Sequence, residues 1–146
     1  MPPSPRLEDF PHRTFDKLRY ADTDRQGHIN NRVFSTLFET GRVEMLYGGE
    51  APLHGVDCSF VIARLAIDFA SELHWPGTVQ IGTRVASVGR SSIRLEQTLF
   101  QAGRAVASAE SVIVHVAAAD GRSSPLTDAA REALQAYHAP APEASA

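Results

Sequence analysis

The chain has 146 residues, of which 43% are apolar and 21% are charged, a composition close to that of ordinary soluble globular proteins. This length is typical of a single domain, and the composition excludes collagen-like, coiled-coil and wholly disordered chains. The 14 basic and 17 acidic residues give a net charge of −3. No global positive field therefore attracts nucleic acid or an anionic membrane, and neither is an expected partner.

Both ends of the chain lack the apolar residues that would offset the entropy cost of ordering them. Residues 1–12 hold four of the nine prolines, and only Ala, Pro, Glu and Ser follow His138. We therefore expect a flexible N-terminal segment at 1–12, one folded domain at 13–137 and a disordered tail at 138–146. The sequence shows no secretory signal and no apolar run of about 18–20 residues, which predicts a cytoplasmic protein.

After a short predicted strand at Arg13–Tyr20, the strongest periodic signal is helical and spans Asn31–Tyr47. Apolar or small residues recur there with the period of one helix face, at Phe34, Leu37, Phe38, Gly41, Met45 and Leu46. Asn30 suits the N-cap of this helix, and the pair of glycines at 48–49 suits its end. Gly41 lies on the buried stripe, which predicts close packing against a flat surface.

The rest of the domain alternates in the manner of β-strands. Four strands are predicted after the helix, at Ser59–Ala70, Val79–Val88, Ser92–Gln101 and Ala105–Ala118. A short terminal helix is predicted at Asp128–Tyr137, with Thr127 as its cap. One apolar-striped helix and one long sheet can be buried only if the sheet curls over the helix. The sequence therefore predicts an α+β fold in which the helix packs inside the curved sheet.

Several well-known catalytic and metal-binding patterns are absent. The chain has no G-x-S-x-G, P-loop, G-x-G-x-x-G or H-E-x-x-H motif. Its six histidines are widely spaced, and a single cysteine excludes an internal disulfide and a multi-cysteine zinc site. We expect no metal and no cofactor. Cys58 is interpreted as a small buried residue rather than as a nucleophile activated by a distant histidine.

The most informative segment joins the first strand to the long helix and reads Arg19-Tyr-Ala-Asp-Thr-Asp-Arg-Gln-Gly-His-Ile-Asn-Asn31. Asp, Gly and Asn form turns and caps, so a purely structural role is one interpretation. The other is an electrophilic site. Free N–H groups of a first helical turn can polarise a carbonyl oxygen while a nearby carboxylate attacks the carbon or activates water.

This segment, followed by Phe38-Glu39 and Arg42, resembles the hotdog-fold acyl-CoA thioesterases of the 4-hydroxybenzoyl-CoA thioesterase-like family. Ile67-Asp-Phe69 and Gly89-Arg-Ser-Ser-Ile93 also match at similar distances. The resemblance covers about residues 13–137. It implies a hotdog fold, in which a long central helix is wrapped by a five-stranded antiparallel sheet.

The resemblance also implies roles for single residues. Asp24 matches the catalytic carboxylate, Gly27 the glycine that lets the thioester approach, and the Asn31 N–H the donor to the thioester carbonyl. Whether Asp24 attacks directly or deprotonates water stays open. His28 is a candidate for orienting water or the carboxylate, and a satisfied loop histidine is the alternative. Asp22 is expected to hold the turn, and Glu39 and Arg42 are expected to form a structural pair.

Coenzyme A carries phosphates, for which arginine and backbone N–H groups are suitable partners. The turn at Arg90, Ser91 and Ser92 is similar to one beside the pantetheine channel of relatives, with a solvated hairpin tip as the alternative. Arg64 interrupts an apolar strand and needs a partner. Asp68 or an acidic group across a subunit boundary can supply it. Arg64 and the 90–92 turn are therefore the candidate CoA-binding residues.

The leading functional hypothesis is hydrolysis of an acyl-CoA thioester. The alternatives are a hydratase or dehydratase on the same fold, an acyl-carrier-protein thioesterase, and a non-catalytic module that binds acyl thioesters. The segment Cys58–Ala70 should form an apolar sheet edge that needs cover. In hotdog proteins the matching strand pairs with its two-fold mate, which implies a homodimer or a tetramer built from dimers.

Overall fold

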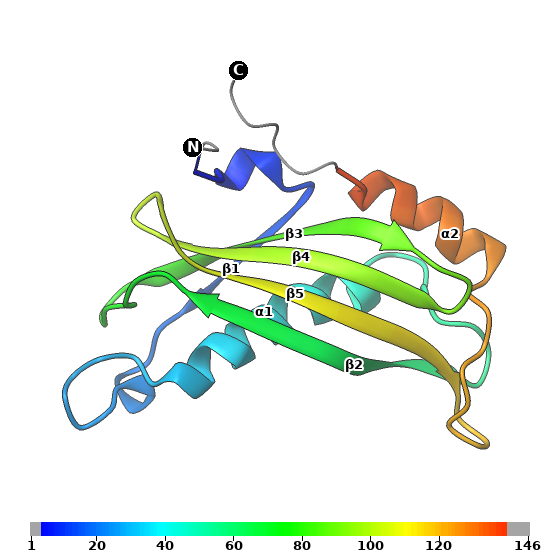
Figure 1. Cartoon of the computed structure of the whole chain (residues 1–146), viewed down its shortest axis with the longest axis horizontal. Helices are drawn as coiled ribbons and strands as arrows, with labels where there is room; N and C mark the ends of the chain where they lie inside the picture. Colours follow the sequence, from blue (N-terminus) through cyan, green and yellow to red (C-terminus); the bar gives the residue numbers. More distant parts are fainter. Residues whose placement is uncertain (1–3, 140–146) are drawn as a thin grey trace.

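The computed structural model describes residues 4–139 and contains one antiparallel sheet with a helix against it. The strands are β1 His12–Lys17, β2 Cys58–Phe69, β3 Thr78–Val88, β4 Ser92–Gln101 and β5 Arg104–Ala117. The five strands lie in the order β1-β3-β4-β5-β2, and every neighbouring pair is antiparallel. The helices are α1 Asn31–Tyr47 and α2 Asp128–Leu134. The expected α+β class is therefore confirmed, as is the five-stranded antiparallel sheet (Figure 1).

Helix α1 has 17 residues and begins and ends where the sequence predicts. The Asn30 side chain accepts a hydrogen bond from the Arg32 N–H at 3.0 Å, which confirms the N-cap. A Cβ placed on Gly41 would lie 2.7 Å from Ile81 and 2.8 Å from the amide nitrogen of Gln97. The absence of a side chain there lets α1 approach β3 and β4 closely, as expected.

The core divides into two apolar clusters along α1. One surrounds the N-terminal half of the helix and includes Phe34, Phe38 and Leu99, and the other joins Met45 to α2 through residues such as Leu134. Between them, the buried Gln97 amide donates to the Phe38 carbonyl at 2.9 Å and to the Thr83 hydroxyl at 3.0 Å. These hydrogen bonds hold the middle of α1 on the sheet.

Two elements are shorter than the sequence predicts. Strand β1 ends at Lys17 rather than Tyr20, because the chain turns into a 3-10 helix at Tyr20–Asp22. The Asp22 carboxylate caps that turn by accepting from the Arg19 N–H at 2.8 Å. Helix α2 ends at Leu134, and Gln135–Tyr137 continue as a 3-10 turn, a common way for a helix to finish.

Residues 7–10, just before β1, make contacts that sequence patterns do not reveal. Leu7–Asp9 form a 3-10 helix, and Phe10 is 3% exposed. A Cβ placed on Gly82 would lie 2.5 Å from the Phe10 ring, so Gly82 provides the space that Phe10 occupies.

The domain boundary at residue 13 stays a prediction. Most of the predicted tail lies outside the described residues. No helix within residues 4–139 is long and apolar enough to span a membrane.

Strand β2 forms one edge of the sheet in the single chain, as predicted. It exposes large apolar side chains, with Val61 at 45%, Ile62 at 46% and Phe69 at 50% of their surface. A long apolar edge of this kind favours pairing with another strand. The assembly itself stays a prediction.

Candidate active site

In the turn between β1 and α1, hydrogen bonds connect Asp24 with His28. The Asp24 Oδ1 atom accepts hydrogen bonds from the N–H groups of Gln26 at 2.9 Å and His28 at 3.0 Å. The Asp24 N–H in turn donates to the His28 carbonyl at 2.7 Å. Gly27 has a φ of +83°, a conformation that favours glycine, and its N–H donates to the Asp24 carbonyl at 3.0 Å. The backbone thus fixes the carboxylate and leaves Oδ2 without a hydrogen bond inside residues 4–139.

The backbone donors in the first turn of α1 differ in their partners. The Arg32 N–H is taken by the Asn30 side chain, and the Val33 N–H donates to the Asn30 carbonyl at 2.9 Å. In the described part of the chain, the Asn31 N–H has no hydrogen-bond acceptor. An unpaired N–H at a helix N-terminus is a suitable donor to a carbonyl oxygen that becomes negative.

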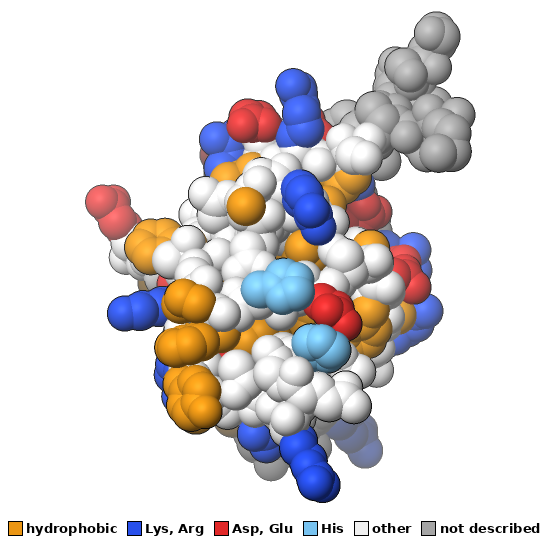
Figure 2. All heavy atoms as spheres, turned by 90° about the vertical axis from the view of Figure 1, so that its left-hand side faces the viewer, with side chains coloured by type: hydrophobic (Ala, Val, Ile, Leu, Met, Phe, Trp, Pro, Cys, Tyr) orange, Lys and Arg blue, Asp and Glu red, His pale blue; other side chains and the backbone are white. Residues whose placement is uncertain are grey.

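Asp24, His28 and Asn31 line one cavity of about 390 Å³, which we call the Asp24 cavity. Its remaining lining residues are Ile29, Phe34, Phe69, Ala70, Ser71 and Glu72. The Phe34 and Phe69 rings pack edge to face, with 5.1 Å between their centroids, and form an apolar wall. Figure 2 shows this end of the molecule, with histidine and acidic side chains near its centre and hydrophobic side chains gathered along one side. The cavity thus combines a carboxylate, a free N–H and an apolar wall.

Glu72 is a member of this cavity that the sequence did not indicate. Its Oε1 atom lies 3.5 Å from the His28 Nδ1 atom. Glu72 follows the end of β2, 44 positions after His28 in the sequence (72 − 28). No local pattern links the two residues, so only the fold brings them together.

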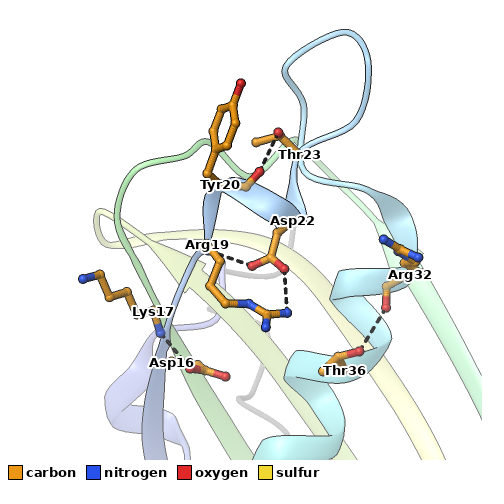
Figure 3. Close-up of polar contacts among 8 residues, drawn as sticks. All are labelled: Asp16, Lys17, Arg19, Tyr20, Asp22, Thr23, Arg32 and Thr36. Carbon is orange, nitrogen blue, oxygen red and sulfur yellow. Dashed lines mark hydrogen bonds and ion pairs between the residues drawn. The ribbon is translucent and has the colours of Figure 1, made fainter.

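Asp22 holds the turn, as predicted. It is 6% exposed, and its two oxygens accept from the Arg19 N–H at 2.8 Å and the Arg19 guanidinium at 3.0 Å. It lines a larger hollow of about 660 Å³ between β1 and α1, which we call the outer hollow and which does not include Asp24. Figure 3 shows Lys17 on the β1 side of this hollow and Arg32 on the α1 side, with the Arg19–Asp22 pair between them.

The predicted CoA-binding turn lies at the opposite end of the sheet from Asp24, beside α2 (Figure 1). The Arg131 guanidinium donates to the carbonyls of Gly89 at 2.9 Å and Arg90 at 2.7 Å. The Ser91 carbonyl accepts from the His115 N–H at 2.8 Å, and Ser92 begins β4. Within one chain, the structure does not bring this turn to the Asp24 cavity.

Arg64 does not line the Asp24 cavity either. It alternates with Leu65, which packs on the core, and therefore lies on the outer face of the sheet. Its ion-pair partner is Glu110 of β5, at 3.8 Å, rather than Asp68, and Glu110 also pairs with Arg94 at 3.2 Å.

Two further expectations concern Glu39 with Arg42, and Cys58. Within residues 4–139, Glu39 and Arg42 form no ion pair. Arg42 is 7% exposed, its burial lowers the pKa of the guanidinium, and the Glu39 charge opposes this shift.

Near Cys58, both ring nitrogens of His115 are engaged, at 3.0 Å from the Gly55 N–H and 3.0 Å from the Ser124 carbonyl. His115 therefore has no free nitrogen with which to activate the Cys58 thiol.

No cluster of three or more His, Cys, Asp or Glu side chains in the described ranges is arranged to hold a metal ion. The polar groups of the Asp24 cavity are suited to acyl transfer instead. The free N–H can stabilise an oxyanion, and the carboxylate can attack a carbonyl carbon or accept a proton.

Three solved structures illustrate what the fold is similar to. A thioesterase from Thermus thermophilus, complexed with coenzyme A and Zn, is 32% identical, with 89% of this chain and 96% of that chain covered and a TM-score of 0.77. The PA5185 protein of Pseudomonas aeruginosa strain PAO1 is 27% identical, with 94% and 98% covered and a TM-score of 0.83. A predicted thioesterase from Bacillus stearothermophilus is 25% identical, with 88% and 97% covered and a TM-score of 0.79.

No curated protein sequence matches the chain. The family model described as the thioesterase-like superfamily matches residues 18–134, which is most of the chain and includes both the Asp24 turn and the whole sheet from β2 to β5. The resemblance to hotdog thioesterases is therefore confirmed, and thioester hydrolysis is the general activity that it supports. The chain belongs to the thioesterase-like superfamily.

Proposed function

We propose that this protein hydrolyses an acyl-CoA thioester to the free acid and CoA. The observation that supports this most strongly is the unpaired Asn31 N–H in the cavity that also contains the Asp24 carboxylate. A thioester carbonyl is already electrophilic. Its hydrolysis therefore requires an oxygen nucleophile and a donor to the developing oxyanion, and the cavity contains a group suited to each task.

In this proposal, the thioester oxygen accepts a hydrogen bond from the Asn31 N–H, and Asp24 supplies the base or the nucleophile. Two backbone N–H groups bind Asp24 Oδ1, so Oδ2 is the oxygen left for the reaction. Gly27 keeps the turn in the conformation that these hydrogen bonds require. The Phe34 and Phe69 wall offers an apolar surface for the acyl group.

Coenzyme A is the proposed thiol because the Thermus thermophilus relative is described as a complex with it. Arg90, Ser91 and Ser92 can contribute to CoA binding only from a second copy of the chain, since they lie at the far end of the sheet. If two copies paired in an antiparallel manner through their β2 edges, the Arg90 end of one copy would lie beside the Asp24 end of the other. We therefore propose a homodimer, or a tetramer of dimers, with Arg90 as a phosphate contact, and we leave Arg64 out of the site.

The test is thiol release from short, medium, long and aromatic acyl-CoAs, with acyl-carrier-protein thioesters beside them. We expect turnover of at least one acyl-CoA by the wild-type protein. Tight binding of acyl-CoA without thiol release would instead indicate a binding module. Hydration of an enoyl-CoA would indicate a hydratase, and turnover of carrier-protein thioesters alone would replace CoA as the thiol.

A further inference from the structure

We infer that Glu72 is a positioning residue for His28, and that the pair orients the water that attacks the thioester. This inference rests on the proposed function. Glu72 and His28 line the same cavity as Asp24 and Asn31, and the Glu72 Oε1 atom lies 3.5 Å from the His28 Nδ1 atom. Neither side chain is buried, with 42% of His28 and 55% of Glu72 exposed, so both groups are accessible to solvent in the single chain.

The backbone of His28 is already immobilised from both sides. Its N–H donates to the Asp24 carboxylate at 3.0 Å, and its carbonyl accepts from the Asp24 N–H at 2.7 Å. Only the rotation of the side chain remains free. A carboxylate facing Nδ1 restricts that rotation, and it favours the tautomer in which Nδ1 carries the proton.

In that tautomer, the second ring nitrogen is a hydrogen-bond acceptor. A neutral imidazole has one donor and one acceptor, so Nδ1–H directed at Glu72 leaves the Nε2 lone pair for the cavity. A water molecule between His28 and Asp24 can then donate one hydrogen to Nε2 and the other to Asp24 Oδ2. Its oxygen lone pair is left to face the thioester carbon, the geometry that attack requires.

The resulting reaction is balanced without a further reactant. The water oxygen forms a bond to the carbonyl carbon, and one water proton passes to Asp24 Oδ2. Negative charge moves to the carbonyl oxygen, against the Asn31 N–H. The carbonyl then re-forms as the carbon–sulfur bond breaks, and the leaving thiolate takes the proton back from Asp24. The products are the acid and the thiol, and Asp24 and His28 return to their starting protonation states.

Glu72 also borders a second hollow, of about 540 Å³, that contains His74 and Arg104. His74 is therefore an alternative imidazole partner for the same carboxylate. It lies outside the Asp24 cavity, and its backbone N–H and carbonyl are held by the Gln101 side chain at 2.9 and 2.8 Å. The His74→Gln variant thus removes a neighbouring imidazole without touching the proposed water site, which makes it a matched control.

The experiment is a double-mutant cycle on kcat, with Glu72→Gln and His28→Gln separately and together. We expect His28→Gln to lower kcat by about 10²-fold. Glu72→Gln should lower it by about 10-fold, the smaller effect of losing a carboxylate that orients a functional histidine. The double variant should be no slower than His28→Gln alone, because Glu72 acts through His28. KM and the melting temperature should change little in each variant, and Glu72→Asp should recover part of the lost rate.

Four outcomes overturn the inference while leaving the proposed function standing. The first is a wild-type kcat in Glu72→Gln, and the second is a double variant in which the two losses of kcat multiply. The third is that the effect of Glu72→Gln on kcat depends on His74 and not on His28. The fourth is a change confined to KM or to the melting temperature. Failure of the proposed function looks different, because the wild-type protein would then release no thiol from any acyl-CoA, and no cycle could be measured.

Discussion

The two aspartates of the turn before α1 lie two positions apart and are used in opposite ways. Asp22 is buried, and both of its oxygens are bound by Arg19. Asp24 is exposed, binds backbone N–H groups with one oxygen only, and faces a cavity with a free helix N–H. A carboxylate with both oxygens satisfied stabilises a turn, whereas one with a free oxygen remains available for chemistry. The difference predicts separate phenotypes for the two residues.

The largest expected effect is on catalysis at Asp24. Asp24→Asn nearly preserves the shape of the side chain but removes its charge, so kcat should fall by about 10²–10⁴-fold. The melting temperature and the oligomeric state should stay close to those of the wild type, because the side chain lies outside the core. Steady-state thiol release and thermal melting on the same preparation measure both. A near-normal kcat with reduced stability would reduce Asp24 to a turn former.

Asp22→Asn should give the reverse result. The amide cannot accept from Arg19 with both of its polar atoms, so its buried NH2 group faces the Arg19 guanidinium without an acceptor. The free energy of unfolding should fall by about 1–3 kcal/mol, while kcat of the folded protein stays near the wild-type value. Urea denaturation with activity measured at low urea separates the two quantities. If Asp22→Asn lost turnover without losing stability, the division of roles between the two aspartates would be wrong.

Gly27→Ala tests whether the turn conformation itself matters. The φ of +83° costs a residue with a Cβ about 1–2 kcal/mol, although no atom lies within 4 Å to clash. Gly121→Ala is a matched control, since Gly121 has a φ of +70°, equally open space and a position after β5. Both variants should lose similar stability in thermal melting. Only Gly27→Ala should also lower kcat, by about 10-fold, through displacement of Asp24.

The smallest expected effect concerns the far end of the sheet. If Arg90 of a second copy contacts a CoA phosphate, Arg90→Ala should raise KM by about two- to fivefold, the effect of an exposed ion pair, and leave kcat unchanged. The increase should disappear with a pantetheine thioester, which lacks the nucleotide. Light scattering on the same sample should show a dimer or a tetramer. An active monomer at micromolar concentration would contradict this assignment.

Much of the local structure could be predicted from the sequence because its signals are local. The 3.6-residue period and the Asn30 cap set the limits of α1, and alternation with turn residues placed β2 to β5 to within one residue at each end. The motif from Asp24 to Asn31 also indicated a candidate site, through its resemblance to the thioesterase family. The hydrogen bonds of this short turn follow from its own residues. Asp22 as a turn residue was predicted correctly for the same reason.

The remaining features depend on contacts between distant segments, which spacing does not encode. The fold alone brings Glu72 to His28, pairs Arg64 with Glu110, buries Arg42 without an ion pair to Glu39, and places Phe10 over Gly82. It also places Arg90 far from Asp24 in the same chain. The sequence by itself therefore determined the elements and the conformation of the Asp24 turn, whose energies are local. The neighbours of that turn were decided by the packing of the sheet on α1.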